Sequence, residues 1–123
     1  MHEWGVAREL VRQAEGEARR RGAREVRSVT ARVGPLSGVA PELLARAYEV
    51  ARLGTLLESA ALSVEPDPVL ASCRECGREG PLEGAVLACP RCGNRELVVR
   101  GGDALHLAKI EIEIGPEPPG GEG

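Results

Sequence analysis

Apolar residues recur at helical spacing near the start of the chain. Along residues 3–21 they fall on successive helical turns, three or four positions apart except for one adjacent pair: Trp4, Ala7, Leu10, Val11, Ala14 and Ala18. This spacing puts them on one side of an amphipathic helix. Glu15 and Arg19 are one turn apart, in the orientation that stabilises a helix, and Gly22 follows as a stop signal. The pattern therefore predicts a helix over residues 3–21.

A second helix and three strands follow from the rest of the pattern. Pro41 suits the first position of a helix, with an apolar face formed by Leu43, Leu44, Ala47, Tyr48 and Ala51. Alternating apolar and β-branched residues predict strands over 24–33, 60–65 and 105–114. In the last strand the apolar residues change phase near Ala108–Lys109, which predicts a β-bulge or a strong twist there.

The order of these elements predicts an α+β fold. The strand–helix–strand unit is expected to form a right-handed parallel crossover, and the last strand must join the same sheet. The result is a small mixed three-stranded sheet with two helices, interrupted by a cysteine-containing module. We expect an α/β domain from residues 1–68 and 99–114, a metal-binding module over 69–98, and a disordered Pro- and Gly-rich tail over 115–123.

The four cysteines of the chain stand in two C-x-x-C-G knuckles: Cys73, Cys76, Cys89 and Cys92. Each turn brings two thiolates to one side of a tight loop, and the glycine that follows lets the backbone curl around them. Four soft ligands favour Zn²⁺. Because all four ligands are sulfur, no coordination position is open for water, so the predicted zinc is structural rather than catalytic.

Three other interpretations of the cysteines compete with structural zinc. Redox C-x-x-C pairs normally open a helix, whereas Pro81, Pro90 and several glycines surround these pairs. Structural disulfides are disfavoured because the N-terminus has no secretory signal. Iron in a rubredoxin-like site stays open, because the spacing alone does not distinguish it from zinc.

Composition excludes some classes of function. The formal net charge of the 123 residues is −3, and there is one Trp, one Tyr and no Phe, which disfavours binding to nucleic acid. No apolar run approaches the roughly 20 residues of a membrane helix, so no membrane association is expected. A thiolate metal site fits a reducing compartment, and we expect a cytoplasmic protein.

The start of the chain offers a second metal site. The α-amine of Met1, the amide nitrogen of His2 and its imidazole can chelate one ion in a plane, and the Glu3 amide nitrogen or carboxylate would complete the set. Such a nitrogen-rich set suits Ni²⁺ or Cu²⁺ better than Zn²⁺. The competing interpretation is a solvated terminal histidine beside a glutamate that complements the helix dipole. The other histidine, His106, is interpreted as an ordinary sheet residue.

Several motifs together resemble one protein family. Met1-His2-Glu3 opens an amphipathic helix, and Val33-Gly34-Pro35-Leu36-Ser37-Gly38-Val39 precedes the second helix. The paired knuckles follow, and a Gly102-Asp103-x-Leu105 segment leads into the last strand. In this order, over residues 1–114, the chain resembles the HypA/HybF family of hydrogenase nickel-incorporation proteins.

The resemblance implies a nickel metallochaperone for [NiFe]-hydrogenase maturation, which is not an enzyme. It implies Ni²⁺ as cargo at Met1, His2 and Glu3, and structural Zn²⁺ at the four cysteines. It also implies two partners, a hydrogenase-maturation GTPase and the [NiFe]-hydrogenase large subunit, and some family members also serve urease. We expect a monomer or weak homodimer. The alternatives are a zinc-ribbon adaptor or transcription-associated interaction module without nickel function and, third, a thiol oxidoreductase.

Overall fold

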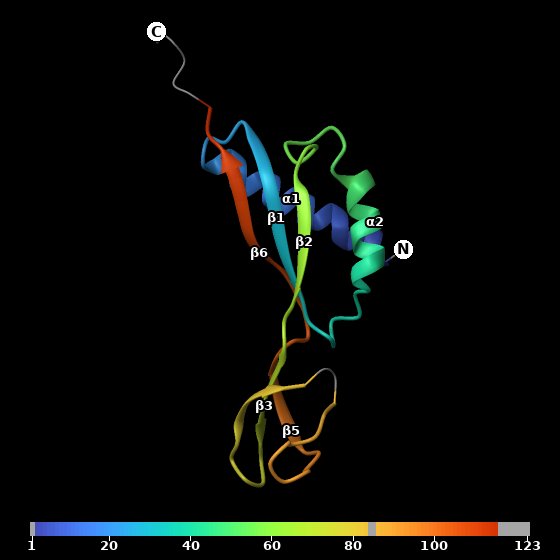
Figure 1. Ribbon diagram of the computed structural model, residues 1–123, viewed down its shortest axis with the longest axis vertical. Coiled ribbons are helices and arrows are strands. Elements are labelled where there is room, and N and C mark those ends of the chain that lie inside the picture. Colours follow the sequence, from blue (N-terminus) through green and yellow to red (C-terminus); the bar gives the residue numbers. More distant parts are fainter. Residues whose placement is uncertain (1, 84–85, 116–123) are drawn as a thin grey trace.

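The computed structural model describes residues 2–83 and 86–115 (Figure 1). The expectations for Met1 and for residues 116–123 of the tail lie outside this part of the chain. The described residues form helices α1 (His2–Arg20) and α2 (Pro41–Ala51). They also form strands β1 (Glu25–Val33), β2 (Ala61–Pro66), β3 (Val69–Cys73), β4 (Glu79–Leu82), β5 (Leu97–Gly101) and β6 (Leu105–Glu113).

The mixed three-stranded sheet is present as predicted. Its strand order is β2-β1-β6, with β1 parallel to β2 and antiparallel to β6. Thr30 pairs with Lys109, but the next residue, Ala31, pairs with Leu107. Ala108 is therefore an extra residue in β6, and the β-bulge predicted there is confirmed.

The main core lies between this sheet and the helices. The buried residues of α1 are Ala7, Leu10, Val11, Ala14 and Ala18, and most of them cluster with Val26, Val29 and Ala31 of β1 and with Tyr48 of α2. Trp4 and Leu43, which were predicted on the apolar faces, are 36% and 48% exposed. Leu44 and Tyr48 define the buried direction of α2, and Leu43 points about 100° away from Leu44 around the helix axis. Neither described helix is long and apolar enough to cross a membrane.

Ion pairs support α1, and one of them also ties it to the α2–β2 connection. Arg19 Nη2 lies 3.2 Å from Glu15 Oε2, as the one-turn spacing predicted. The same Glu15 oxygen accepts a hydrogen bond from the Leu56 backbone N–H at 2.9 Å. Glu15 therefore fixes tertiary structure as well as the helix, a role that its sequence spacing does not reveal.

The cysteine module contains a second three-stranded sheet that the sequence pattern did not predict. Its order is β4-β3-β5, and both pairings are antiparallel. A small core of Val69, Ala71 and Leu82 supports it, with Leu36 and Leu97 packed against this cluster. Figure 1 shows the module at one end of the molecule, where β3 continues from β2 and β5 leads back into β6.

Two glycines allow the module to approach the larger sheet closely. A Cβ atom on Gly102, whose φ is 83°, would lie 2.5 Å from Val69 Cα, and a Cβ atom on Gly34 would lie 2.7 Å from Gly102 Cα. The backbone N–H of Leu36 donates to the Gly102 carbonyl at 3.0 Å, and that of Asp67 donates to the Val33 carbonyl at 3.1 Å. Backbone contacts therefore join the two parts.

Candidate metal centres

The two cysteine knuckles have the same local structure. In the first, the Cys73 N–H donates to the Arg78 carbonyl at 2.8 Å and the Gly77 N–H donates to the Cys73 carbonyl at 3.0 Å. In the second, the Cys89 N–H donates to the Asn94 backbone carbonyl at 2.8 Å, and the Gly93 N–H donates to the Cys89 carbonyl at 2.7 Å. The φ angles of the two glycines are 79° and 80°, a conformation that glycine adopts without steric cost. The repeated C-x-x-C-G sequence therefore folds into a repeated turn.

The four sulfur atoms have the spacing that one metal ion needs. All of them lie within 4.8 Å of one another. Cys73 Sγ is 3.7 Å from Cys92 Sγ, and Cys76 Sγ is 3.6 Å from Cys89 Sγ. A tetrahedral ion with metal–sulfur bonds of about 2.3 Å places its sulfurs about 3.8 Å apart, whereas a disulfide needs about 2.05 Å. The residues therefore fit a single four-thiolate metal centre.

Nearby N–H groups stabilise the thiolate form of these ligands. The Cys76 N–H points at Cys73 Sγ at 3.5 Å, and the Asn94 side chain donates to the same sulfur at 3.6 Å. The Cys76 hydrogen bond, opposed by burial and aided by Asn94, lowers the pKa of Cys73 to about 6. The pKa of Cys92 is lowered by a hydrogen bond from the Asn94 backbone N–H. Burial and the neighbouring sulfurs act more strongly in the opposite direction and raise the pKa of Cys92 to about 12. Four thiolates this close repel one another, so a bound cation is needed to ionise the full set.

The N-terminal site residues are placed at the start of α1. His2 is exposed and is the first residue of the helix. The first four N–H groups of a helix have no acceptor within it, so the amide nitrogens of His2 and Glu3 are not committed to helical hydrogen bonds. Glu3 Oε2 accepts a hydrogen bond from the Ala40 N–H at 3.1 Å, which lowers the pKa of Glu3 below its ordinary value. Ala40 immediately precedes α2, so this bond ties the starts of both helices together.

His2 also borders a groove of about 590 Å³. Apolar side chains in its lining come from α1, from the loop before α2 and from β6: Val6, Val39 and Leu105. The other histidine, His106, does not join this site. Its side chain is 53% exposed and its Nδ1 lies 3.8 Å from Asp67 Oδ2, which agrees with its interpretation as an ordinary sheet residue.

The two candidate sites are separate. Within residues 2–83 and 86–115, the four cysteines are the one group of three or more metal-ligating side chains that converge. Sequence reasoning missed two residues that support the sites, Ala40 and Asn94. No pattern marks Ala40, because its contact with Glu3 spans 37 positions. Asn94 directly follows the second knuckle glycine, and that position beside a ligand turn was an available signal.

Fold and site together define a small α+β metalloprotein in which a four-cysteine module is inserted into a mixed sheet. The model of the family described as hydrogenase/urease nickel incorporation metallochaperone HypA matches residues 1–112. The chain belongs to this family of nickel metallochaperones. The match includes the first helix as well as the cysteine module, which disfavours the zinc-ribbon adaptor.

Individual relatives match this chain over nearly their whole length. The hydrogenase maturation factor HypA of Nitrosospira multiformis is 38% identical over 112 residues, which cover 91% of this chain and 97% of the relative. HypA of Solidesulfovibrio magneticus is 39% identical, covering 92% and 100%. The solution structure of the Ni metallochaperone HypA from Helicobacter pylori has a TM-score of 0.70 at 21% identity, covering 92% of this chain and 98% of that one. The solved structure therefore shares the fold.

Proposed function

We propose that this chain binds Ni²⁺ at Met1, His2 and Glu3 and delivers it during [NiFe]-hydrogenase maturation. The observation that carries the proposal is the exposed position of His2 at the first residue of α1. The imidazole and the amide nitrogens of His2 and Glu3 directly follow the α-amine of Met1 in the sequence, and this nitrogen set suits Ni²⁺. Membership of the nickel metallochaperone family supports the same assignment.

The role proposed for Glu3 follows from its hydrogen bond. Its carboxylate oxygen is engaged by the Ala40 N–H, so the Glu3 amide nitrogen is the better candidate for the fourth ligand. The carboxylate would instead hold the first turn of α1 against the start of α2. A nickel ion held by so few residues at an exposed chain end can leave by ligand exchange with a partner, as delivery requires.

We assign structural Zn²⁺ to Cys73, Cys76, Cys89 and Cys92. Four thiolates complete a tetrahedral shell and leave no position for a reacting water, so the centre would stabilise the module that we place at residues 69–98. The core of this module is small, and metal binding would contribute much of its folding free energy. Neither proposed site performs a reaction, and we propose a carrier rather than an enzyme.

The family role implies contact with the hydrogenase maturation machinery. We propose a maturation GTPase and the immature [NiFe]-hydrogenase large subunit as partners in the cytoplasm, with the chain acting as a monomer or weak homodimer. The charged face of α1 is the proposed docking surface for the GTPase. Arg8 is exposed there, and Arg12 pairs with Glu9 at 2.5 Å. Reversing both arginine charges should weaken association and leave nickel uptake unchanged.

Calorimetric titration with Ni²⁺ tests the nickel assignment. Zinc-loaded protein with its native N-terminus should bind one Ni²⁺, and His2→Ala should abolish that binding while zinc content and helical circular dichroism persist. His106→Ala is the matched control, because it removes the other histidine and should bind normally. Loss of nickel binding in His106→Ala, with binding retained in His2→Ala, would reject the assignment.

A further inference from the structure

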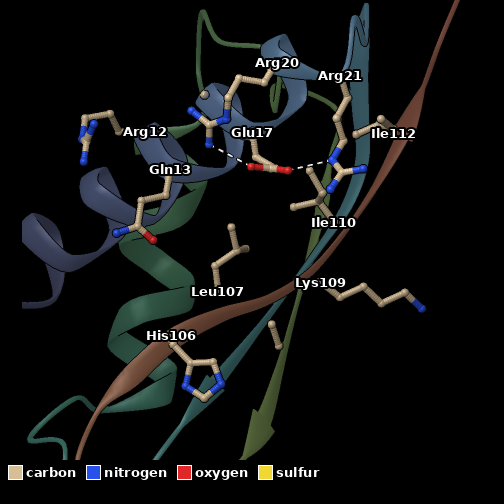
Figure 2. A pocket seen from close by; sticks show the side chains of 12 residues that line it. Arg12, Gln13, Glu17, Arg20, Arg21, His106, Leu107, Lys109, Ile110 and Ile112 are labelled. Carbon is tan, nitrogen blue, oxygen red and sulfur yellow. Dashed lines mark hydrogen bonds and ion pairs between the residues drawn. The ribbon is translucent and has the colours of Figure 1, made fainter.

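A second groove, of about 850 Å³, is lined by residues of α1 and β6 (Figure 2). It is distinct from the groove that His2 borders, although Gln13 lines both. Figure 2 shows α1 side chains along one wall and the β6 ribbon along the other. Neither proposed metal site contributes a ligand to it, so this groove is unexplained by nickel or zinc binding.

The β6 wall is the edge of a sheet. In the order β2-β1-β6, β6 pairs with β1 along one side and with no described strand along the other. An edge strand presents a row of backbone N–H and C=O groups with which another extended segment can pair. The wall is therefore suited to adding a strand, the mode in which backbone bonds hold a peptide and side-chain pockets select it.

The groove floor is apolar. Leu107, Ile110 and Ile112 of β6 line it and are only partly buried, packed against the main core cluster. An added strand would direct alternate side chains to one face. Apolar side chains at every second position would therefore cover this floor, and the positions between them would face away from it.

The groove rim is basic, in a chain whose formal net charge is −3. Arg20 and Arg21 share one carboxylate, Glu17, at 2.8 and 2.7 Å. Lys109 stands on the β6 wall, 3.8 Å from Glu111. These cations are well exposed, with side-chain accessibilities of 71%, 63% and 66%. The shared carboxylate leaves positive charge at the rim that an acidic partner would balance.

We propose that this groove binds an extended acidic segment of a partner protein, which adds to β6 as a fourth strand. The segment would alternate apolar residues, which cover the floor, with Asp or Glu residues, which face away from the floor on the side of Lys109. Arg20 and Arg21 lie on the α1 side of the groove, and their positive charge favours an acidic segment over a basic one. A second copy of this chain is a poorer occupant, because two-fold pairing of β6 edges would bring two basic rims together. The tail beyond Gly115 is also a poorer occupant, since Pro116, Pro118 and Pro119 have no N–H to add to a ladder.

A designed peptide tests the inference in the zinc-loaded, full-length protein. The probe is fluorescein-labelled Glu-Val-Glu-Val-Glu-Val-Glu, and fluorescence anisotropy measures its binding at low salt. A peptide of the same composition with its valines grouped together, and the lysine analogue Lys-Val-Lys-Val-Lys-Val-Lys, should each bind at least tenfold more weakly. Hydrogen exchange should slow at β6 amides when the acidic probe binds, and not at amides of β2, the opposite edge strand.

Two further comparisons separate strand addition from general charge attraction. N-methylation of alternate peptide residues removes donors from one edge of the peptide strand. Of the two offset N-methylated peptides, one should bind normally and the other should lose binding. Arg21→Gln with Lys109→Gln should weaken binding of the acidic probe about tenfold. Arg46→Gln with Arg95→Gln removes equal charge from exposed residues that do not line the groove, and it should change probe binding less than twofold.

Several results would overturn the inference. Equal binding of the alternating and grouped peptides, or equal binding of both N-methylated peptides, would exclude strand addition. Slowed exchange at β6 that depends on protein concentration without peptide would assign the edge to a second copy. Nickel loading should leave binding of the peptide probe unchanged. A failure of the probe to bind would therefore reject the groove proposal without rejecting the nickel site, and a failure to bind nickel would leave the groove proposal standing.

Discussion

Gly34 lies where the larger sheet meets the cysteine module, and Gly34→Ala should destabilise the protein strongly. A Cβ atom there would lie 2.7 Å from Gly102 Cα and closer still to the Gly102 carbonyl group. Normal carbon–carbon contact is about 3.5–4.0 Å, so the two backbones must separate by about 1 Å. No side-chain rotation can relieve the clash, because the opposing atoms are backbone.

The size of the effect follows from the contacts at the junction. Overpacking of this kind costs about 1–3 kcal/mol. The Gly34 N–H donates to the Ala104 carbonyl and the Leu36 N–H donates to the Gly102 carbonyl, both at 3.0 Å, and each such bond contributes about 1 kcal/mol. We therefore expect Gly34→Ala to lower the free energy of unfolding by about 1–5 kcal/mol, depending on how many of these bonds are lost.

Urea unfolding, followed by circular dichroism in saturating Zn²⁺, measures this difference. Gly5→Ala is the matched control, because a Cβ atom at Gly5 meets nothing within 4 Å and alanine is favoured over glycine in a helix by about 0.5–1 kcal/mol. The control should therefore be slightly more stable than the parent. A Gly34→Ala protein within about 0.5 kcal/mol of the parent, the range of neutral surface changes, would refute the close approach at this junction.

Three other predictions concern the metal centre, the helix surface and the link between the sites. Cys73→Ser should release zinc, measured by elemental analysis, and expose the remaining thiols to a thiol reagent; retained zinc would contradict the four-thiolate centre. Arg12→Ala should raise the pKa of Glu9 from about 2 toward its usual 4.5, as measured by carboxyl NMR. Because the fold lowers this pKa, the ion pair stabilises the folded protein above pH 4.5, and this stabilisation is lost as the pH falls toward 2. Leu36→Ala should alter nickel affinity as well as the stability of the cysteine module. The loop of residues 34–40 packs on the module core through Leu36, and it donates a hydrogen bond to Glu3 through Ala40. Unchanged nickel affinity would exclude coupling through this loop.

The sequence pattern predicted the elements whose stabilising contacts are regular and local. The apolar stripe of α1 and the change of phase at Ala108 both follow from helical or strand spacing, and the structure confirms them. The cysteine spacing predicted that the four sulfurs converge, because each knuckle is a short turn closed by its own backbone hydrogen bonds.

The contacts that join distant segments were not predictable in this way. The strands of the second sheet are only four or five residues long, and three residues supply their buried core. Too few apolar positions alternate there to separate a strand from a loop. The hydrogen bond from Ala40 to Glu3 and the packing of Leu36 on the module depend on the tertiary fold, so no local pattern records them.

The proposed nickel site requires the α-amine at the literal start of the chain. The most direct measurement compares Ni²⁺ binding by the native N-terminus with binding by the same protein extended by one glycine before Met1, followed by visible absorption and calorimetry. The extension converts the α-amine of Met1 into an amide while keeping His2, Glu3 and the four cysteines. We predict that the extended protein loses specific nickel binding and its absorption band but keeps its zinc. Full-affinity nickel binding by the extended protein would contradict the proposed site.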